Sequence, residues 1–184
     1  PDIFKPSPSG RGMDEGGFDV VIGNPPYGAD LSEDMANYLI KKFKYQDYQR
    51  DTYLLLVEKS MGLLGQLGIF GMIIPNTWLL NLQSEKIRRF IFSNAEILQI
   101  RHYIKRVFTK VTVDTEIVVF RKMHPSDAHM TQISIVGKDN SVVTYPIPQN
   151  RWQAGEGKPV NIFERPEMSG LANKLRALPI LDNI

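Results

Sequence analysis

The chain has 184 residues, of which 42% are apolar and 23% are charged, and its formal net charge is +2. These values are typical of an ordinary globular domain, and no apolar run approaches the roughly 20 residues of a membrane-spanning helix. The absence of cysteine excludes disulfides and thiolate metal sites. So small a net charge does not by itself indicate a nucleic-acid partner, and the distribution of charge along the chain matters more.

The first predicted strand ends in an unusual loop. Residues 1–17 are rich in proline, glycine and serine, which predicts a loop. Because the chain opens on Pro1 inside that loop, we expect it to be an internal piece of a longer protein. Residues 18–23 (Phe-Asp-Val-Val-Ile-Gly) predict a buried strand. Residues 24–27 (Asn-Pro-Pro-Tyr) follow, and their two prolines fix φ and remove two backbone donors, which predicts a rigid loop.

Two helices and a second strand come next, in an order that predicts a parallel sheet. Residues 32–43 and 52–64 carry apolar residues at helical spacing, and Asp51 is the expected cap of the second helix. Residues 68–75 form a short apolar stretch, expected to be a strand buried on both faces. A strand, a helix and a strand of these lengths are typical of a βαβ crossover.

The remaining chain adds one helix and several strands. Apolar spacing predicts a helix over 83–93 and strands over 97–103 and 115–121. Because no helix separates these two strands, we expect them to pair antiparallel. A hairpin is expected over 131–136 and 142–147. A linker is expected over 149–184, and it should contain a helix over 166–178.

An Asn-Pro-Pro-Tyr loop at the carboxyl end of a parallel strand suits one kind of chemistry. An exocyclic aromatic amine, such as N6 of adenine, is a poor nucleophile because its lone pair is delocalised into the ring. Two acceptors on its N–H groups, the side-chain oxygen of Asn24 and the carbonyl of Pro25, favour a pyramidal amine with a localised lone pair. Tyr27 offers a flat face for a base taken out of its stack. A bare tetrapeptide of this type also occurs as an ordinary turn or a proline-rich ligand, and its place after an apolar strand favours catalysis.

Four motifs, taken together, resemble one enzyme family. Residues 18–27 resemble the catalytic motif of gamma-class N6-adenine DNA methyltransferases, the class that includes type IIG restriction–modification enzymes. Residues 51–59 resemble the helix beside the cofactor in that family, and residues 68–79 resemble the strand and loop that follow it. Residues 107–117 resemble the loop that brings a second aromatic ahead of the next strand. The resemblance covers roughly residues 18–122.

The resemblance implies a role for each residue of the loop. Asn24, Pro25, Pro26 and Tyr27 would form the catalytic motif, with Asn24 and Pro25 holding the adenine amino group. Tyr27 and Phe108 would stack on the two faces of the flipped base. No metal takes part in this chemistry, and the histidines, at positions 102, 124 and 129, lack a metal-ligand spacing.

The resemblance also implies S-adenosylmethionine as the methyl donor, contacted by Asn24, Pro26 and Leu56. The family often has an aromatic residue near Leu56, so a leucine there departs from the pattern. The glycine-rich loop and the acidic ribose-binding residue of this family lie upstream, and this sequence has neither. The Gly-Arg-Gly at 10–12 neither follows a strand nor opens a helix. We therefore expect the chain to carry the base-binding half of a site and to be inactive alone.

Basic residues gather in one part of the chain. Between Lys86 and Lys110 there are seven lysine or arginine residues and a single acidic residue, Glu96. A basic rim that meets DNA phosphates and a solvated helix face explain this stretch equally well. The candidates for contact with the DNA backbone are Arg101, Lys105, Arg106 and Lys110.

The sequence thus predicts the carboxyl-terminal half of an α/β, Rossmann-like, S-adenosylmethionine-dependent methyltransferase domain, with an antiparallel strand pair at the sheet edge. The expected domains are a loop over 1–17, the catalytic half-domain over 18–148, and a linker and helix over 149–184 that lead towards a target-recognition domain. The expected partners are double-stranded DNA, the upstream and downstream parts of the same polypeptide, and a restriction endonuclease domain or subunit. The expected location is the cytoplasm of a bacterial or archaeal cell.

Two alternatives remain open from the residues alone. One is a non-catalytic DNA-binding or specificity segment of a restriction–modification complex. The other is a methyltransferase that acts on RNA or on a protein glutamine, because glutamine and adenine both present a planar amine to the same tetrapeptide.

Overall fold

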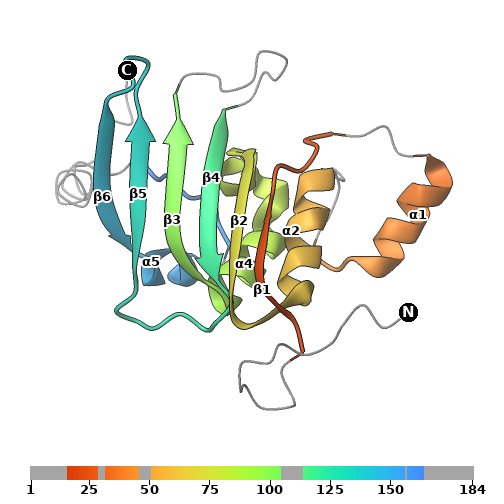
Figure 1. Cartoon of the computed structure of the whole chain (residues 1–184). Helices are drawn as coiled ribbons and strands as arrows, with labels where there is room; N and C mark the ends of the chain where they lie inside the picture. Colours follow the sequence, from red (N-terminus) through yellow and green to blue (C-terminus); the bar gives the residue numbers. More distant parts are fainter. Residues whose placement is uncertain (1–15, 29–31, 46–50, 105–113, 156, 164–184) are drawn as a thin grey trace, which may run out of the picture.

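A computed structural model of the chain describes residues 16–28, 32–45, 51–104, 114–155 and 157–163. Its centre is a six-stranded sheet in the order β1-β2-β4-β3-β5-β6 (Figure 1). The strands are β1 (Phe18–Gly23), β2 (Leu64–Pro75), β3 (Glu96–Tyr103), β4 (Thr115–Arg121), β5 (Met130–Val136) and β6 (Val142–Pro148). The helices are α1 (Glu33–Lys42), α2 (Thr52–Leu63), α3 (Thr77–Leu80), the 3₁₀ turn η1 (Leu82–Ser84), α4 (Glu85–Asn94) and α5 (Asn150–Ala154). Among the described residues, no helix is long and apolar enough to cross a membrane.

The predicted βαβ crossover is confirmed. β1 pairs with β2 in parallel, with Val20 opposite Ile69 and Gly23 opposite Met72, and the connection between the two strands contains α1 and α2. Six of the 12 residues of α2 are buried, as expected for a helix whose apolar residues cover most of its circumference. Asp51 occupies the predicted cap position of α2, although its side chain makes no capping hydrogen bond there.

The antiparallel pairing of β3 with β4 is confirmed, and so is an antiparallel pair at a sheet edge, although β3 and β4 are not that pair. β4 lies between β2 and β3 and pairs antiparallel with both. β3 is covered in turn by β5, which runs parallel to it, and the β5–β6 hairpin supplies the antiparallel pair that does stand at an edge. The order differs because the strand at 115–121 inserts between two strands that precede it in the chain, a long-range pairing that local periodicity does not report.

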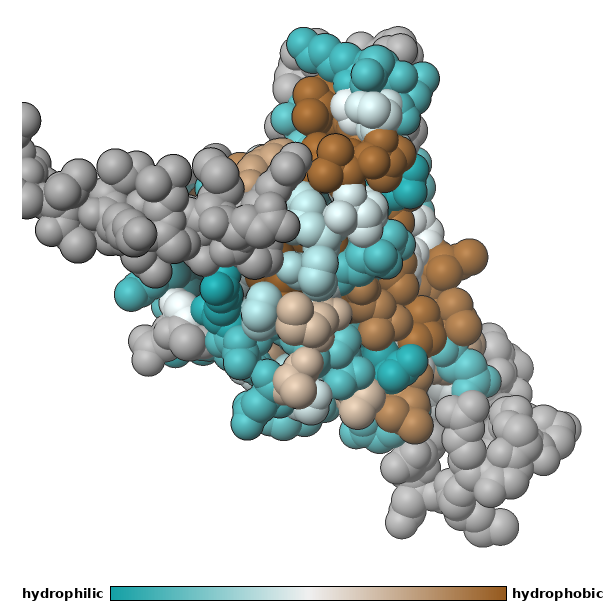
Figure 2. Space-filling view, turned by 90° about the vertical axis from the view of Figure 1, so that its left-hand side faces the viewer, coloured by the Kyte–Doolittle hydropathy of each residue, from teal (hydrophilic) through white to brown (hydrophobic). Residues whose placement is uncertain are grey.

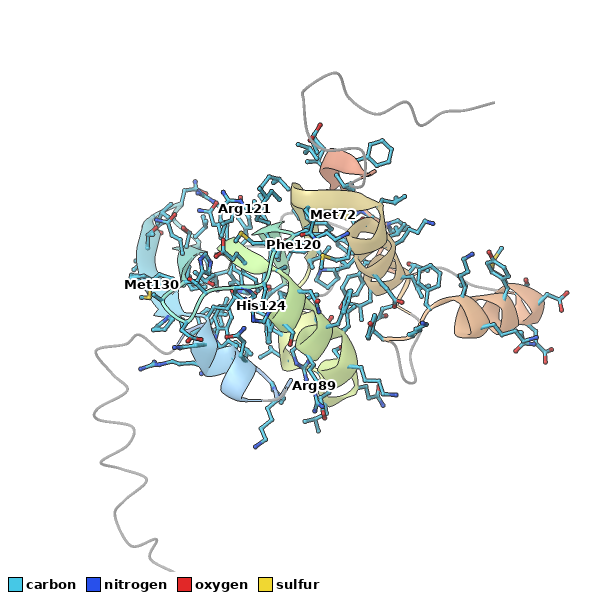
Figure 3. All side chains as sticks on the ribbon, turned by 90° about the horizontal axis from the view of Figure 1, so that it is seen from below. Met72, Arg89, Phe120, Arg121, His124 and Met130 are labelled. Atoms are coloured by element: carbon cyan, nitrogen blue, oxygen red, sulfur yellow. The ribbon has the colours of Figure 1, made fainter. Side chains whose placement is uncertain are left out.

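One face of the sheet is covered by helices. Figure 1 shows α2 and α4 behind the sheet, and Figure 3 shows Met72 and Phe120 on the side that faces them, while Arg89 lies on the far side of α4. The core beneath the helices is apolar, and the rings of Phe70 and Phe120 stack with their centres 4.2 Å apart. Burial of this kind, worth about 25 cal/mol per Å² of apolar surface, is what holds the helices to the sheet.

The other face is not covered by any described helix, and this overturns the prediction that the first strand is buried. Phe18, Val20 and Ile22 alternate onto this face and are 44%, 53% and 76% exposed. The second strand is only half-buried there, at Ile69 and Ile73. Figure 2 shows apolar residues gathered along the side of the molecule to which this face is turned. A continuous apolar run predicts two buried faces, and only one is buried among the described residues.

The described chain stays packed for a short distance after β6. Gln149 is fully buried: its side-chain oxygen accepts from the Ile97 N–H at 2.8 Å, and its amide group donates to the Ala95 carbonyl at 2.7 Å. Trp152 and Val160 join the apolar core. The expected linker therefore begins with residues that are anchored to α4 and β3. The helix predicted over 166–178 lies outside the described residues.

Candidate functional site

The predicted catalytic loop lies at one end of the sheet, together with several other chain segments. β1, β2, β3 and β5 all run in the same direction, so their carboxyl ends meet at that end. Pro75 and Tyr103 both pair with Thr115, which places the start of β4 there as well. In open α/β sheets this is the end at which ligands bind.

The catalytic loop exposes the side-chain amide of Asn24, and its backbone is held by a hydrogen bond from α2. Asn24 and Pro26 are exposed, whereas Pro25 is buried. The Thr52 hydroxyl, on the first residue of α2, donates to the Pro26 carbonyl at 2.8 Å. Because this bond uses the carbonyl of Pro26 and not that of Pro25, it anchors the loop without engaging the acceptor that the sequence assigns to catalysis.

Tyr27 is held by both segments of the crossover. Its hydroxyl donates to the Ile73 carbonyl of β2 at 3.4 Å, and its ring meets the ring of Tyr53 edge-on, with the centres 6.4 Å apart and an angle of 78° between the planes. Burial raises the pKa of the Tyr27 phenol above its usual value, so the hydroxyl remains a donor at neutral pH. The ring is half-buried, which leaves part of its surface accessible.

Behind Tyr27 lies a pair of hydroxyl groups. The phenol oxygen of Tyr53 lies 2.9 Å from the Thr77 hydroxyl, and Tyr53 is 1% exposed. Burial is the main reason that the pKa of Tyr53 lies well above its usual value. The pair joins the first turn of α2 to the turn that follows β2.

A buried carboxylate stands next to this turn. One oxygen of Glu116 accepts from the Trp78 indole N–H at 3.1 Å, and the other lies 3.1 Å from Nδ1 of His102. Glu116 is 1% exposed, and burial raises the pKa of its carboxyl, an effect that the hydrogen bond from His102 opposes. Sequence reasoning missed this cluster, although a glutamate at the start of an apolar strand was a signal for it.

The remaining predicted site residues either lie on elements other than the catalytic loop or lie outside the described residues. Leu56 is 38% exposed on α2, which fits an apolar contact surface. Arg101 is half-buried on β3, with its guanidinium carbon 5.8 Å from the centre of the Tyr103 ring. The predicted base-stacking Phe108 and the candidate DNA contacts Lys105, Arg106 and Lys110 lie outside the described residues.

Arg88 shows that not every basic residue between Lys86 and Lys110 is exposed. The residue is fully buried, and its guanidinium donates to the Trp78 and Gly157 carbonyls, each at 2.7 Å. Burial lowers the pKa of the group from its usual value. This arginine ties α4 to the turn that carries Trp78 and is a structural cation.

Replacing Thr52 by valine is expected to loosen the loop anchor. Valine keeps the shape of threonine but cannot donate to the Pro26 carbonyl. The free energy of unfolding should fall by about 0.5–1 kcal/mol, the net value of a partly solvated hydrogen bond. Chemical denaturation of the chain measures this, and Thr52→Ser, which retains the hydroxyl, is the matched control. Equal losses for serine and valine would show that the bond does not anchor the loop.

Comparison with known proteins places the chain in a family. Residues 2–108, more than half of the chain, match the model of the Eco57I restriction-modification methylase. The chain is 33% identical over 82 residues to the type II restriction enzyme and methyltransferase RM.Eco57I of Escherichia coli, covering 42% of this chain and 8% of that protein. It is 34% identical over 84 residues to the type II methyltransferase M.BstVI of Geobacillus stearothermophilus, covering 44% of this chain and 15% of that protein.

Solved structures show the same fold. The crystal structure of the type IIG restriction endonuclease BpuSI matches with a TM-score of 0.58 and 15% identity, covering 77% of this chain and 20% of that one. The type I restriction enzyme EcoKI M protein matches with a TM-score of 0.52 and 15% identity, covering 82% and 33%. The fold is thus that of the S-adenosylmethionine-dependent methyltransferases. With the family model covering the Asn-Pro-Pro-Tyr loop and the crossover behind it, the chain belongs to the Eco57I restriction-modification methylase family.

Proposed function

We propose that the chain is part of a DNA methyltransferase of a restriction–modification system, one that methylates N6 of adenine. The observation that carries the proposal is the exposed Asn24 amide, which stands between a strand end and the buried Pro25 at the carboxyl edge of the sheet. Membership of a restriction–modification methylase family supports the reaction class. Adenine is the further step, and it rests on the chemistry of the loop.

The loop residues have separate roles in this proposal. The side-chain oxygen of Asn24 and the carbonyl of Pro25 accept hydrogen bonds from the two N–H groups of the target amine. These bonds localise the lone pair on the nitrogen. Tyr27 stacks on the flipped base, an interaction worth about 1–3 kcal/mol. Phe108 is proposed for the opposite face. Unstacking the base costs a few kcal/mol, and the two rings offset that cost.

S-adenosylmethionine is the proposed methyl donor, and when bound it supplies an electrophilic methyl group to the amine. The described residues fit one wall of such a site. Asn24 offers an exposed amide, and Leu56 offers an exposed apolar side chain on α2. Pro26, two residues after Asn24 in the sequence, is exposed as well. The chain therefore contributes base positioning, and only one side of the cofactor contact.

The rest of the protein is proposed to complete the site. The chain spans 8% to 15% of the length of the curated relatives it matches, so activity, substrate and partners belong to a larger polypeptide. We place the half-domain at 18–148 between an upstream half, joined through 1–17, and a target-recognition domain, joined through 149–184. Double-stranded DNA and a restriction endonuclease domain or subunit are the proposed partners, acting in the cytoplasm. Arg101, Lys105, Arg106 and Lys110 are the proposed phosphate contacts.

Methyl transfer by the full-length protein tests the proposal. The protein is incubated with isotopically labelled S-adenosylmethionine and duplex DNA, and the DNA is digested to nucleosides for mass spectrometry. Labelled N6-methyladenine is the expected product. Label in cytosine, or label only in parallel reactions with RNA or with protein, would overturn it. The 184-residue chain alone is expected to transfer no label.

A further inference from the structure

The first turn of α2 contacts both the backbone and the ring of the catalytic loop. Thr52 donates to the Pro26 carbonyl, and the ring of Tyr53, the next residue, meets the ring of Tyr27 edge-on. An edge-to-face contact between aromatic rings favours one relative orientation because the positive edge of one ring meets the negative face of the other. The orientation of Tyr27 therefore depends on where the ring of Tyr53 is held.

The Tyr53 ring is fixed at its far end by one hydrogen bond. Its phenol oxygen lies 2.9 Å from the Thr77 hydroxyl; Tyr53 is buried in the core, and the bond is partly buried. Thr77 opens the short helix α3, directly after the turn that ends β2. The bond thus connects α2 to α3, which follows the strand whose Ile73 carbonyl accepts from Tyr27.

The position of Thr77 is itself fixed by its neighbours. The N–H of Asn76 donates to the Asp114 carbonyl at 2.9 Å, which ties the turn to the start of β4. On the other side of Thr77, the Trp78 indole donates to the buried Glu116, and Glu116 is also bonded to His102 of β3. A rigid support on both sides makes Thr77 a defined anchor for the Tyr53 hydroxyl.

We propose that Tyr53 and Thr77 are positioning residues of the methyl-transfer site, which set the orientation of the Tyr27 ring against the flipped base. The inference rests on the proposed function and deepens it. Neither residue touches the base. Their hydroxyl pair holds the Tyr53 ring, and that ring in turn fixes the face that Tyr27 presents to its ligand.

The test uses the full-length protein with one hydroxyl removed at a time. Tyr53→Phe keeps the ring and loses the bond, and Thr77→Val keeps the shape and loses the same bond. Each is expected to lower kcat for adenine methylation about threefold to tenfold, the kinetic equivalent of one hydrogen bond, with KM for S-adenosylmethionine unchanged. The double variant should show the same fall as either single variant, because both remove one interaction. Thr77→Ser, which keeps the hydroxyl, should retain wild-type kcat.

A second measurement, the fluorescence of the flipped base, distinguishes an effect on positioning from an effect on stability. With 2-aminopurine at the target position, Tyr53→Phe and Thr77→Val should change the fluorescence of the flipped base, whereas Thr77→Ser should not. Tyr145→Phe is the matched control, because it also removes one phenol hydrogen bond, to the Ile162 carbonyl at 2.6 Å, on the far edge strand β6. It should lower the melting temperature and leave kcat and the fluorescence unchanged.

The outcomes distinguish this inference from the proposed function. If the unsubstituted protein methylates adenine and the Thr77→Val rate equals it, the inference alone is overturned. The same conclusion follows if the effects of the single variants multiply in the double variant, or if Tyr145→Phe lowers kcat as much. If the unsubstituted protein transfers no methyl group to adenine, the proposed function is overturned, and the inference falls with it.

Discussion

Replacing Asn24 by alanine is expected to reduce adenine methylation by the full-length protein by at least about a hundredfold, and up to a thousandfold, while DNA binding stays close to that of the wild type. The side-chain oxygen of Asn24 is one of the two acceptors proposed for the target amine, and removal of one preorganised polar group of this kind costs about that factor in kcat. The residue is exposed at the end of β1, so its loss leaves the fold intact. Labelled S-adenosylmethionine and single-turnover kinetics measure the rate of transfer.

A matched control exists on the opposite side of the molecule. Asn94, at the end of α4, donates through its side-chain amide to the Phe90 carbonyl at 2.8 Å and is exposed as Asn24 is. Asn94→Ala should retain the wild-type rate. Tyr27→Ala should lose both methylation and base flipping. Wild-type activity in Asn24→Ala or in Tyr27→Ala would sink the assignment of this loop to catalysis.

Replacing Glu116 by alanine is expected to lower the free energy of unfolding by at least about 2 kcal/mol, because two buried polar groups lose their partner at about 1–3 kcal/mol each. The carboxylate is the buried acceptor for the Trp78 indole and the partner of His102, and alanine leaves both polar groups without it inside the core. Chemical denaturation followed by tryptophan fluorescence suits this test, because Trp78 itself reports on the site. A loss below about 1 kcal/mol, the size of an ordinary surface effect, would contradict it.

Glu116→Gln provides the control and a test of pH dependence. Glutamine keeps the volume and one acceptor, so it should cost less stability than alanine.

Burial raises the pKa of Glu116 in the folded chain above its value in the unfolded chain, although the bonds from His102 and Trp78 oppose this. The stability that this group contributes is therefore greatest at low pH and is lost as the pH rises through the folded-state pKa. The stability of the wild type relative to Glu116→Gln should fall as the pH rises above about 4.3, the value of an unperturbed glutamate. Parallel stability curves for the two proteins would refute this linkage.

Local structure was predictable from the sequence to a large extent. The strands expected over 97–103 and 115–121 form within one residue of those limits, and the helix expected after Asp51 begins at Thr52. These elements follow from apolar spacing and turn residues, which are properties of neighbouring positions. The rigid loop at 24–27 also follows, because two consecutive prolines restrict the backbone wherever they occur.

Long-range relations were not predictable in the same way. The insertion of β4 between β2 and β3 is a choice among pairings that all satisfy the same apolar pattern. The bond from Thr52 to the Pro26 carbonyl joins residues 26 positions apart, and nothing in either residue type specifies it. Glu116 fell inside a stretch expected to form apolar core, where its partners come from two other segments. Phe108 was assigned to the base through family resemblance, and the phosphate contacts were assigned from the basic stretch between Lys86 and Lys110. All of these contacts stay predictions.

Because one side of β1 is uncovered, we expect this strand to have a lower local stability than the central strands of the sheet. The strand that carries the Asn24 loop packs on β2 and α2 but pairs with no other described strand, and its outward residues Phe18, Val20 and Ile22 are exposed. Few buried contacts and an unpaired edge are the marks of a segment with low local stability. Among the described residues, α2 and β2 support the loop from one side of β1, and we expect the loop to become better ordered when the proposed upstream half of the domain is present. If the proposed function is correct, completing the sheet on the β1 side should therefore raise the rate of methyl transfer, so that assembly and activity are coupled.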